Sequence, residues 1–293
     1  MSLSRPRPAR ISGLLVTAIA VSAGLITSAP ALAVAGPEAG AGQLPSVVKL
    51  NIGDEANSRA CTGTLVDQSW IATAASCFAS TPGTPVPAGK PALKATATLS
   101  DGKTVEITEI APRDDRDAAL VRLATAVTTI KPATPAAAAP ATGAELTAAG
   151  FGRTKTEWVP DKLHTGTFTL GTTAATTYAI TGKGTDVLCK GDTGGPLLNA
   201  AGELVGINSR SWQGGCLGTP TTETRTGAIT TRTDDLAQWI RDTVRPGVQH
   251  DLNGDGRSDA VMTYYHADGS IGFYTSLGNA GGGFGDFTPG YTV

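Results

Sequence analysis

Oxygen-bearing side chains recur at alternate positions near the C-terminal end, in Asp251-Leu-Asn-Gly-Asp-Gly-Arg-Ser-Asp259, which fits the pattern D-x-[DN]-x-D-G-x-x-D. Oxygens at this spacing converge on one cation, and the glycines permit the tight loop. The predicted calcium ligands are the side chains of Asp251, Asn253, Asp255 and Asp259 and the main-chain carbonyl of Arg257. A solvated Asp/Gly turn that binds no metal is the alternative interpretation.

The four cysteines, Cys61, Cys77, Cys189 and Cys216, are the second group whose residue type and spacing imply chemistry. No pair has the C-x-x-C spacing of a structural zinc site. An even number of cysteines in an exported protein indicates disulfide bonds. Four cysteines allow three connectivities, and the pairing closest in sequence joins Cys61 to Cys77 and Cys189 to Cys216.

The N-terminal segment predicts export. Three arginines among the first ten residues precede an apolar stretch over residues 11–26, and Ala31-Leu-Ala33 has the small-x-small pattern of a signal-peptidase site. A membrane anchor is the alternative, but the stretch is short for a span of about 20 residues and is interrupted by Ser, Gly and Thr. We expect residues 1–33 to be a cleaved signal peptide and the mature, extracellular protein to have no membrane-spanning segment.

Composition narrows the class of protein further. The chain has 293 residues, of which 40% are hydrophobic, 16% charged and 5% aromatic, so it supports a core and is not disordered. Low charge with abundant Thr, Val, Ala and Gly favours short strands and many turns. A formal net charge of −2 without a basic block gives no electrostatic support for a nucleic-acid partner.

Short strands separated by Asp, Gly, Pro and Ser clusters are predicted in two lobes, residues 34–130 and residues 144–233. A Pro/Ala/Thr-rich extended connection, Lys131–Gly143, joins the lobes. The predicted strands are Ser46–Ile52, Cys61–Val66, Trp70–Ala75, Ala92–Leu99, Thr104–Ile110, Ala118–Leu123, Glu145–Ala149, His164–Thr169, Thr177–Thr181, Pro196–Asn199, Glu203–Asn208 and Thr226–Thr230.

One helix is predicted over Asp234–Val244, with an Asp at its start and Leu236, Trp239 and Ile240 on one face. Pro246 and the glycine after it end the helix. A separate Gly- and Asp-rich segment, residues 250–293, follows the domain that covers residues 34–245.

Three ordered motifs carry a family resemblance: residues 61–77 (CTGTLVDQSWIATAASC), Asp117–Leu123 (DAALVRL) and Cys189–Pro196 (CKGDTGGP). Together they resemble the trypsin-like, chymotrypsin-fold serine proteases over about residues 34–244. The resemblance implies an all-β fold of two packed six-stranded antiparallel barrels with a catalytic cleft between them, followed by a C-terminal helix. It also implies the Cys61–Cys77 and Cys189–Cys216 disulfides.

Two of the three catalytic positions depart from the family pattern. The family's Ala-Ala-His-Cys is Ala-Ala-Ser-Cys here, so Ser76 stands where the general-base histidine is expected. The family's Gly-Asp-Ser-Gly-Gly reads Gly-Asp-Thr-Gly-Gly, so Thr193 stands at the nucleophile. Only Asp117, the acid that orients the base, matches.

These replacements remove the usual chemistry. A hydroxyl is a poor nucleophile unless an adjacent base takes its proton, and a serine hydroxyl cannot be that base near neutral pH. The extra methyl of Thr193 also crowds the approach to a carbonyl. Loss of triad members together costs about 10⁶-fold in turnover in subtilisin. The three histidines, His164, His250 and His266, are expected at the surface or in turns, away from the cleft.

Other positions match the family. Gly191 and the main-chain N–H of Thr193 correspond to the oxyanion hole, which needs only main-chain donors. Asp192 corresponds to the acid that pairs with a new N-terminus, here Val34 of the stretch Val34-Ala-Gly36. The alternative is that Asp192 only caps its own turn. An unpaired buried carboxylate is costly, which favours the ion pair.

The resemblance also places a specificity pocket. Val187 stands where trypsin itself carries an acid, Gln213 and Gly227 stand at the walls, and Ser211 precedes the family-like Trp212. An apolar, partly obstructed pocket without attraction for Lys or Arg is expected.

The Asp-rich loop is similar to the calcium loop of FG-GAP (integrin-type β-propeller) repeats. An EF-hand would carry Glu at the position of Met262 and continue as a helix, whereas strands are predicted here at Ala260–Tyr265 and Ile271–Ser276. The segment is about one blade long, and a propeller needs about 4–8. A lone calcium-stabilised module and part of a larger propeller both remain open.

Three functions follow. The first is a secreted trypsin-like serine endopeptidase homologue, inactive or very weak in proteolysis, that binds a peptide or protein segment in the inter-barrel cleft. The second is a low-activity hydrolase that uses Thr193 as nucleophile. The third is calcium-dependent adhesion to an extracellular partner through the C-terminal module.

Overall fold

The computed structural model describes residues 36–40, 42–54, 58–244, 257–279 and 283–292, together with Met1 and Leu252. In this part of the chain no helix is long and apolar enough to cross a membrane. The apolar stretch over residues 11–26 and the Val34 terminus lie outside the described residues.

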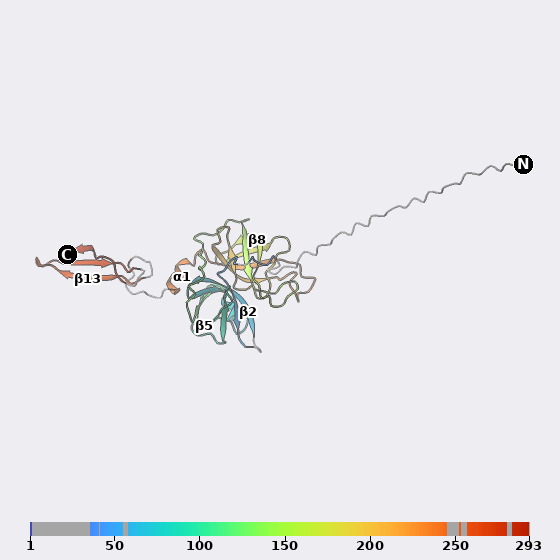
Figure 1. Ribbon diagram of the computed structural model, residues 1–293, viewed down its shortest axis with the longest axis horizontal. Coiled ribbons are helices and arrows are strands. Elements are labelled where there is room, and N and C mark those ends of the chain that lie inside the picture. The colour runs from blue at the N-terminus through green and yellow to red at the C-terminus, as the bar shows by residue number, and fades with distance from the viewer. Residues whose placement is uncertain are drawn as a thin grey trace. The chain divides into compact units, whose positions relative to one another are not determined.

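Six antiparallel strands close the first barrel in the order β1-β2-β3-β6-β5-β4. A matching set of six closes the second barrel in the order β10-β11-β12-β9-β8-β7. The strands of the first are β1 (Val47–Ile52), β2 (Arg59–Asp67), β3 (Trp70–Thr73), β4 (Ala95–Thr98), β5 (Thr104–Pro112) and β6 (Ala119–Leu123). Those of the second are β7 (Glu145–Gly150), β8 (His164–Thr173), β9 (Thr177–Gly182), β10 (Pro196–Leu198), β11 (Leu204–Ser211) and β12 (Gly227–Arg232). Figure 1 labels β2 and β5 in the first barrel and β8 in the second. The predicted all-β, chymotrypsin-like fold is therefore confirmed.

Alternating burial shows how these sequences make barrel walls. Along the first seven residues of β8 every second residue is buried, which places Phe168 and Leu170 in the core with Tyr178 and Ile180 of β9. Threonine supplies many of the outward positions, since a β-branched side chain suits a pleated, half-buried surface.

The two barrels share one apolar cluster, which fixes their relative position. Leu198, Leu204 and Ile207 of the second barrel are buried in the same cluster as the side chains of the first barrel. Leu236 and Ile240, at and just before the C-terminal helix, complete the cluster. Loops at the junction of the barrels are therefore held by a continuous core.

Helix α1 (Ala237–Val244) begins later than predicted. Asp234, expected at its start, instead accepts a hydrogen bond of 2.6 Å from the Tyr178 hydroxyl and pairs with Arg232 at 2.8 Å. Asp234, which was predicted at the start of the helix, therefore anchors the segment before α1 to strands β9 and β12 of the second barrel.

The strand predicted over Trp70–Ala75 is also shorter in the structure. β3 ends at Thr73, and Ala75–Cys77 forms a single 3₁₀ turn closed by the Phe78 N–H, which donates to the Ala75 carbonyl at 2.9 Å. Because β3 ends before Ala75, Ser76 lies in this turn and outside the sheet.

The C-terminal module is a three-stranded antiparallel sheet in the order β13-β14-β15. The strands β13 (Ala260–Tyr265) and β14 (Ile271–Ser276) have their predicted bounds. The third strand, β15 (Thr288–Thr292), was not predicted because it contains Pro289 and a glycine, which indicate a turn. It lies at the sheet edge, and its register shifts opposite Phe273/Tyr274, which is where a strand tolerates proline.

Candidate active site

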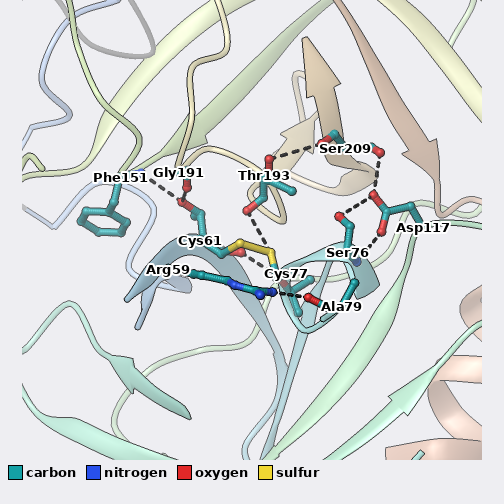
Figure 2. The surroundings of a disulfide bond; sticks show 12 residues. Arg59, Cys61, Ser76, Cys77, Ala79, Asp117, Phe151, Gly191, Thr193 and Ser209 are labelled. Atoms are coloured by element: carbon teal, nitrogen blue, oxygen red, sulfur yellow. Dashed lines mark hydrogen bonds between the residues drawn. A yellow bond between two sulfur atoms is a disulfide. The ribbon is translucent and has the colours of Figure 1, made fainter. Parts of the chain in front are cut away.

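Loops from both barrels bring the triad-equivalent residues together beside the Cys61–Cys77 disulfide (Figure 2). The first barrel supplies Ser76, in the turn after β3, and Asp117, two residues before β6. The register of β3 against β6 pairs Thr73 with Ala119, so the two loops leave the sheet side by side. The second barrel supplies Thr193 from the loop before β10.

Asp117 is fully engaged as a hydrogen-bond acceptor. Its Oδ1 accepts from the Ser76 main-chain N–H at 2.8 Å, and its Oδ2 accepts from the Ser76 hydroxyl at 2.9 Å. The Ser209 hydroxyl donates to the same Oδ2 at 2.6 Å. The proton of Ser76 is thus directed at Asp117, and the hydroxyl oxygen is too weakly basic near neutral pH to take a nucleophile's proton.

Among the described residues, neither an imidazole nor a carboxylate is hydrogen-bonded to the Thr193 hydroxyl. Its Oγ1 donates to the main-chain carbonyl of Ser209 at 3.2 Å. An amide carbonyl cannot take the proton away, so the hydroxyl is held but not activated. In Figure 2 the Thr193 hydroxyl points to the Ser209 carbonyl and the Ser76 hydroxyl points to Asp117, and no imidazole lies between the two hydroxyls.

Ser209 is a functional residue that sequence reasoning missed. The family-like Ser-Trp pair pointed to Ser211, two residues later on β11. In the structure Ser211 donates its hydroxyl to the Leu188 carbonyl instead, and Ser209 holds Asp117. The available signal was strand alternation, since residues two apart on β11 share one face.

Neither of the two histidines that the structure describes lies at the base position. His164, expected at the surface, is buried at the start of β8, where it pairs with Gly150 and bridges to Glu38. Burial is the main cause of its lowered pKa. His266 lies in the turn after β13, where its main-chain N–H donates to the Ser270 carbonyl. His250 falls outside the described residues.

The loop before β10 keeps main-chain donors available. Its turns are closed by the N–H groups of Asp192 and Gly195, which donate to the carbonyls of Cys189 and Asp192 at 3.0 Å each. Gly191 has a φ of +102°, and a Cβ there would lie 2.7 Å from the Gly152 Cα, so only glycine fits. Neither Gly191 nor Thr193 donates its N–H to another described residue. Both groups are therefore free to bind an oxyanion or a peptide carbonyl.

Asp192 is the most deeply buried acid of the site. Its carboxylate accepts from the N–H groups of Gly152 and Cys189, both at 2.8 Å. Burial raises its pKa to about 7, against the effect of these two hydrogen bonds. The predicted partner, Val34, lies outside the described residues, so the ion pair stays a prediction.

The residues predicted to form the specificity pocket differ in burial and in backbone conformation. Val187 is fully buried and packs with the Cys189–Cys216 disulfide. Gln213 adopts a left-handed φ of 62°, which is costly for a residue with a side chain, and Gly227 lies against Trp212. A cavity of about 560 Å³ nearby is lined mainly by residues 214–221 and not by Val187.

In the C-terminal module only two of the five predicted calcium ligands are described. Asp259 is 4% exposed, and its carboxylate accepts from the N–H of Leu252 at 2.7 Å and of Gly278 at 2.9 Å. Asp251, Asn253 and Asp255 fall outside the described residues. Elsewhere in the part of the chain that the structure covers, no three His, Cys, Asp or Glu residues are grouped to hold a metal ion. Calcium binding therefore stays a prediction.

Comparisons with known proteins agree with the fold. The family model described as "Trypsin" matches residues 33–240. No curated protein matches the sequence. Among solved structures, mouse neuropsin, described as a serine protease expressed in the limbic system of mouse brain, superposes with a TM-score of 0.56 at 20% identity. The match covers 71% of this chain and 98% of the neuropsin chain, and at this identity it shows the fold alone.

Proposed function

The chain belongs to the trypsin family, and from this we propose that it is a proteolytically silent or nearly silent member that works by binding a peptide segment between its barrels. The observation that carries the proposal is the hydrogen-bond arrangement around Asp117. Ser76 fills the base position and donates to the acid, while Thr193 donates to a main-chain carbonyl. Among the described residues Thr193, at the nucleophile position, therefore has neither an imidazole nor a carboxylate to take its proton.

The retained main-chain donors support binding rather than simple loss of function. The N–H groups of Gly191 and Thr193 are available for a peptide carbonyl, and both disulfides brace the loops that carry them. We further propose that the protein is exported, which the two disulfides support because such bonds persist in oxidising compartments.

The test compares labelling by a fluorophosphonate serine probe and turnover of apolar peptide esters. We expect the natural chain to be silent in both assays, and a Ser76→His/Thr193→Ser double variant to gain probe labelling. The matched control is Ser76→His/Thr193→Ala, which has the base but no nucleophile and should stay unlabelled.

Turnover by the natural chain near that of an ordinary serine protease would contradict the proposal. Labelling of Thr193 itself, lost in Thr193→Ala alone, would favour the second candidate, a slow hydrolase with a threonine nucleophile. Calcium-dependent adhesion through the C-terminal module is the third candidate, and deletion of residues 250–293 separates it from peptide binding by the barrels.

A further inference from the structure

A cavity of about 440 Å³ opens beside Thr193 on the side of the Cys61–Cys77 disulfide. Both barrels line it, and its floor includes Gly191 and Thr193 with their available N–H groups. Three described residues of its lining are basic, namely Arg59, Arg153 and Lys190, and none of the described lining is acidic. This concentration of charge is unexpected in a chain whose formal net charge is −2.

The two arginines are held in place by main-chain atoms and not by acids. Arg59 reaches across to the carbonyl oxygens of Ala79 and, at 2.9 Å, of Ser80. Figure 2 shows the contact of Arg59 with Ala79. Arg153 donates to the Leu217 carbonyl at 2.7 Å. Each guanidinium has five N–H donors, so donors remain on both. Within the part of the chain that the structure describes, neither guanidinium pairs with an acidic side chain.

Lys190 completes the group. Its side chain is exposed, and the Arg153 main-chain N–H donates to its carbonyl at 2.8 Å, which keeps the two cations adjacent. Trp158, 61% exposed, stands at the rim with the Arg153 guanidinium 4.8 Å from the centre of its ring. None of the three cations forms an ion pair with an acidic side chain among the described residues.

A second cavity, of about 640 Å³, adjoins Asp117 and Ser76 and is not lined by Thr193. Its lining mixes acids with bases: Arg113, Arg116 and Arg210 with Asp114, Asp115 and Asp117. Asp115 pairs with Arg113 at 2.8 Å and with Arg116 at 2.9 Å, so much of that charge is already compensated. The charges of that lining therefore sum to zero, whereas the described lining of the first cavity is net positive.

We propose that this basic cavity recognises an acidic peptide: Asp or Glu side chains on the part of the bound segment that lies next to the Cys61–Cys77 disulfide. The inference rests on the proposed peptide binding. An arginine fork accepts a carboxylate through two parallel hydrogen bonds, and a lysine adds a point charge. Three cations around one cavity match one or two carboxylates and fall short of the extended basic stripe that a polyanion requires.

The experiment measures binding of two fluorescein-labelled peptide pools by fluorescence polarisation, using the full chain. The pools are identical except that two adjacent positions carry Asp/Glu in one and Asn/Gln in the other. We expect the acidic pool to bind about 10-fold more tightly, the effect of one hydrogen-bonded charge pair. The preference should shrink at high salt and in Lys190→Glu.

Lys131→Glu is the matched control, since it makes the same charge change at an exposed lysine outside the cavity. Equal affinity for the two pools, or an equal loss in Lys131→Glu and Lys190→Glu, would overturn the acidic preference while leaving peptide binding intact. Binding of neither pool would overturn both the inference and the proposed function. Tighter, Lys190-dependent binding of a sulfated polysaccharide would assign the cavity to a glycan instead and overturn the peptide.

Discussion

Asp192 makes the stability of the fold depend on pH in a way that can be measured. Its carboxyl group is fully buried, and burial raises its pKa from 3.8 to about 7. We expect this dependence in a chain that keeps residues 31–33, so that the amine of Val34 is not free. The test variant is Asp192→Asn in the same chain, because an amide of the same shape cannot ionise.

The sign follows from the direction of the shift. A carboxyl group with a raised pKa in the folded state favours folding while it is neutral, so its contribution is full below about pH 4. It is lost as the pH rises toward 7, where the folded protein must bury a negative charge. A difference of about 3 pKa units at 1.36 kcal/mol each gives a loss of about 4 kcal/mol between pH 4 and pH 8.

The free energy of unfolding in urea is measured for both chains at each pH. The contribution of Asp192 is the difference between the two chains in how this free energy changes with pH. The Asp192→Asn variant loses one hydrogen bond, since its NH₂ faces the Cys189 N–H, but that loss is constant with pH. A chain that begins at Val34 should show a smaller decline, because a nearby ammonium group lowers the pKa of the acid. Parallel stability curves for the natural chain and the Asp192→Asn variant from pH 4 to pH 8 would refute the reasoning.

Three further outcomes are expected. Replacing Cys61 and Cys77 with Ala should cost about 3 kcal/mol of unfolding free energy in denaturant titrations, since the bond closes a loop with a sequence separation of 16. Arg116→Ala should cost about 2 kcal/mol, because the side chain is 6% exposed and hydrogen-bonds Asp115 and Asp235, which are themselves partly exposed, and Arg116→Lys should recover only part of it in the same titrations. Calcium should slow proteolysis within residues 251–293 relative to chelator, and Asp255→Ala should abolish that protection; equal rates throughout would identify a solvated turn.

The barrels were predictable because their motifs are local. The three motifs cover β2 to the turn after β3, β6 and the loop before β10, and their order and spacing fix the family. Strands such as β8 also alternate in burial. The disulfide pairing followed from the same resemblance, and the structure has both bonds. The sequence was enough to predict contacts such as the two disulfides, because the family motifs themselves contain Cys61, Cys77 and Cys189.

Long-range polar contacts were not predictable. Asp234 looks like a helix cap by position but bonds to Tyr178, which lies 56 residues earlier. His164 looks like a surface residue but is buried against the segment that carries Glu38. In both cases a tertiary partner competes with the local role, and a single sequence does not reveal that partner.

Under the proposed function, neither Ser76→His nor Thr193→Ser alone should produce an active protease. The Asp117 carboxylate already accepts two hydrogen bonds from Ser76 and one from Ser209, so its acceptor capacity is used without a histidine. Thr193→Ser alone would supply a less crowded hydroxyl but no acceptor for its proton. Ser76→His alone would supply the acceptor. The Thr193 hydroxyl, however, points to the Ser209 carbonyl, and the threonine methyl crowds the approach to a substrate carbonyl. The two substitutions are therefore coupled through one proton, and their combined effect on turnover should exceed the sum of the single effects on the activation free energy.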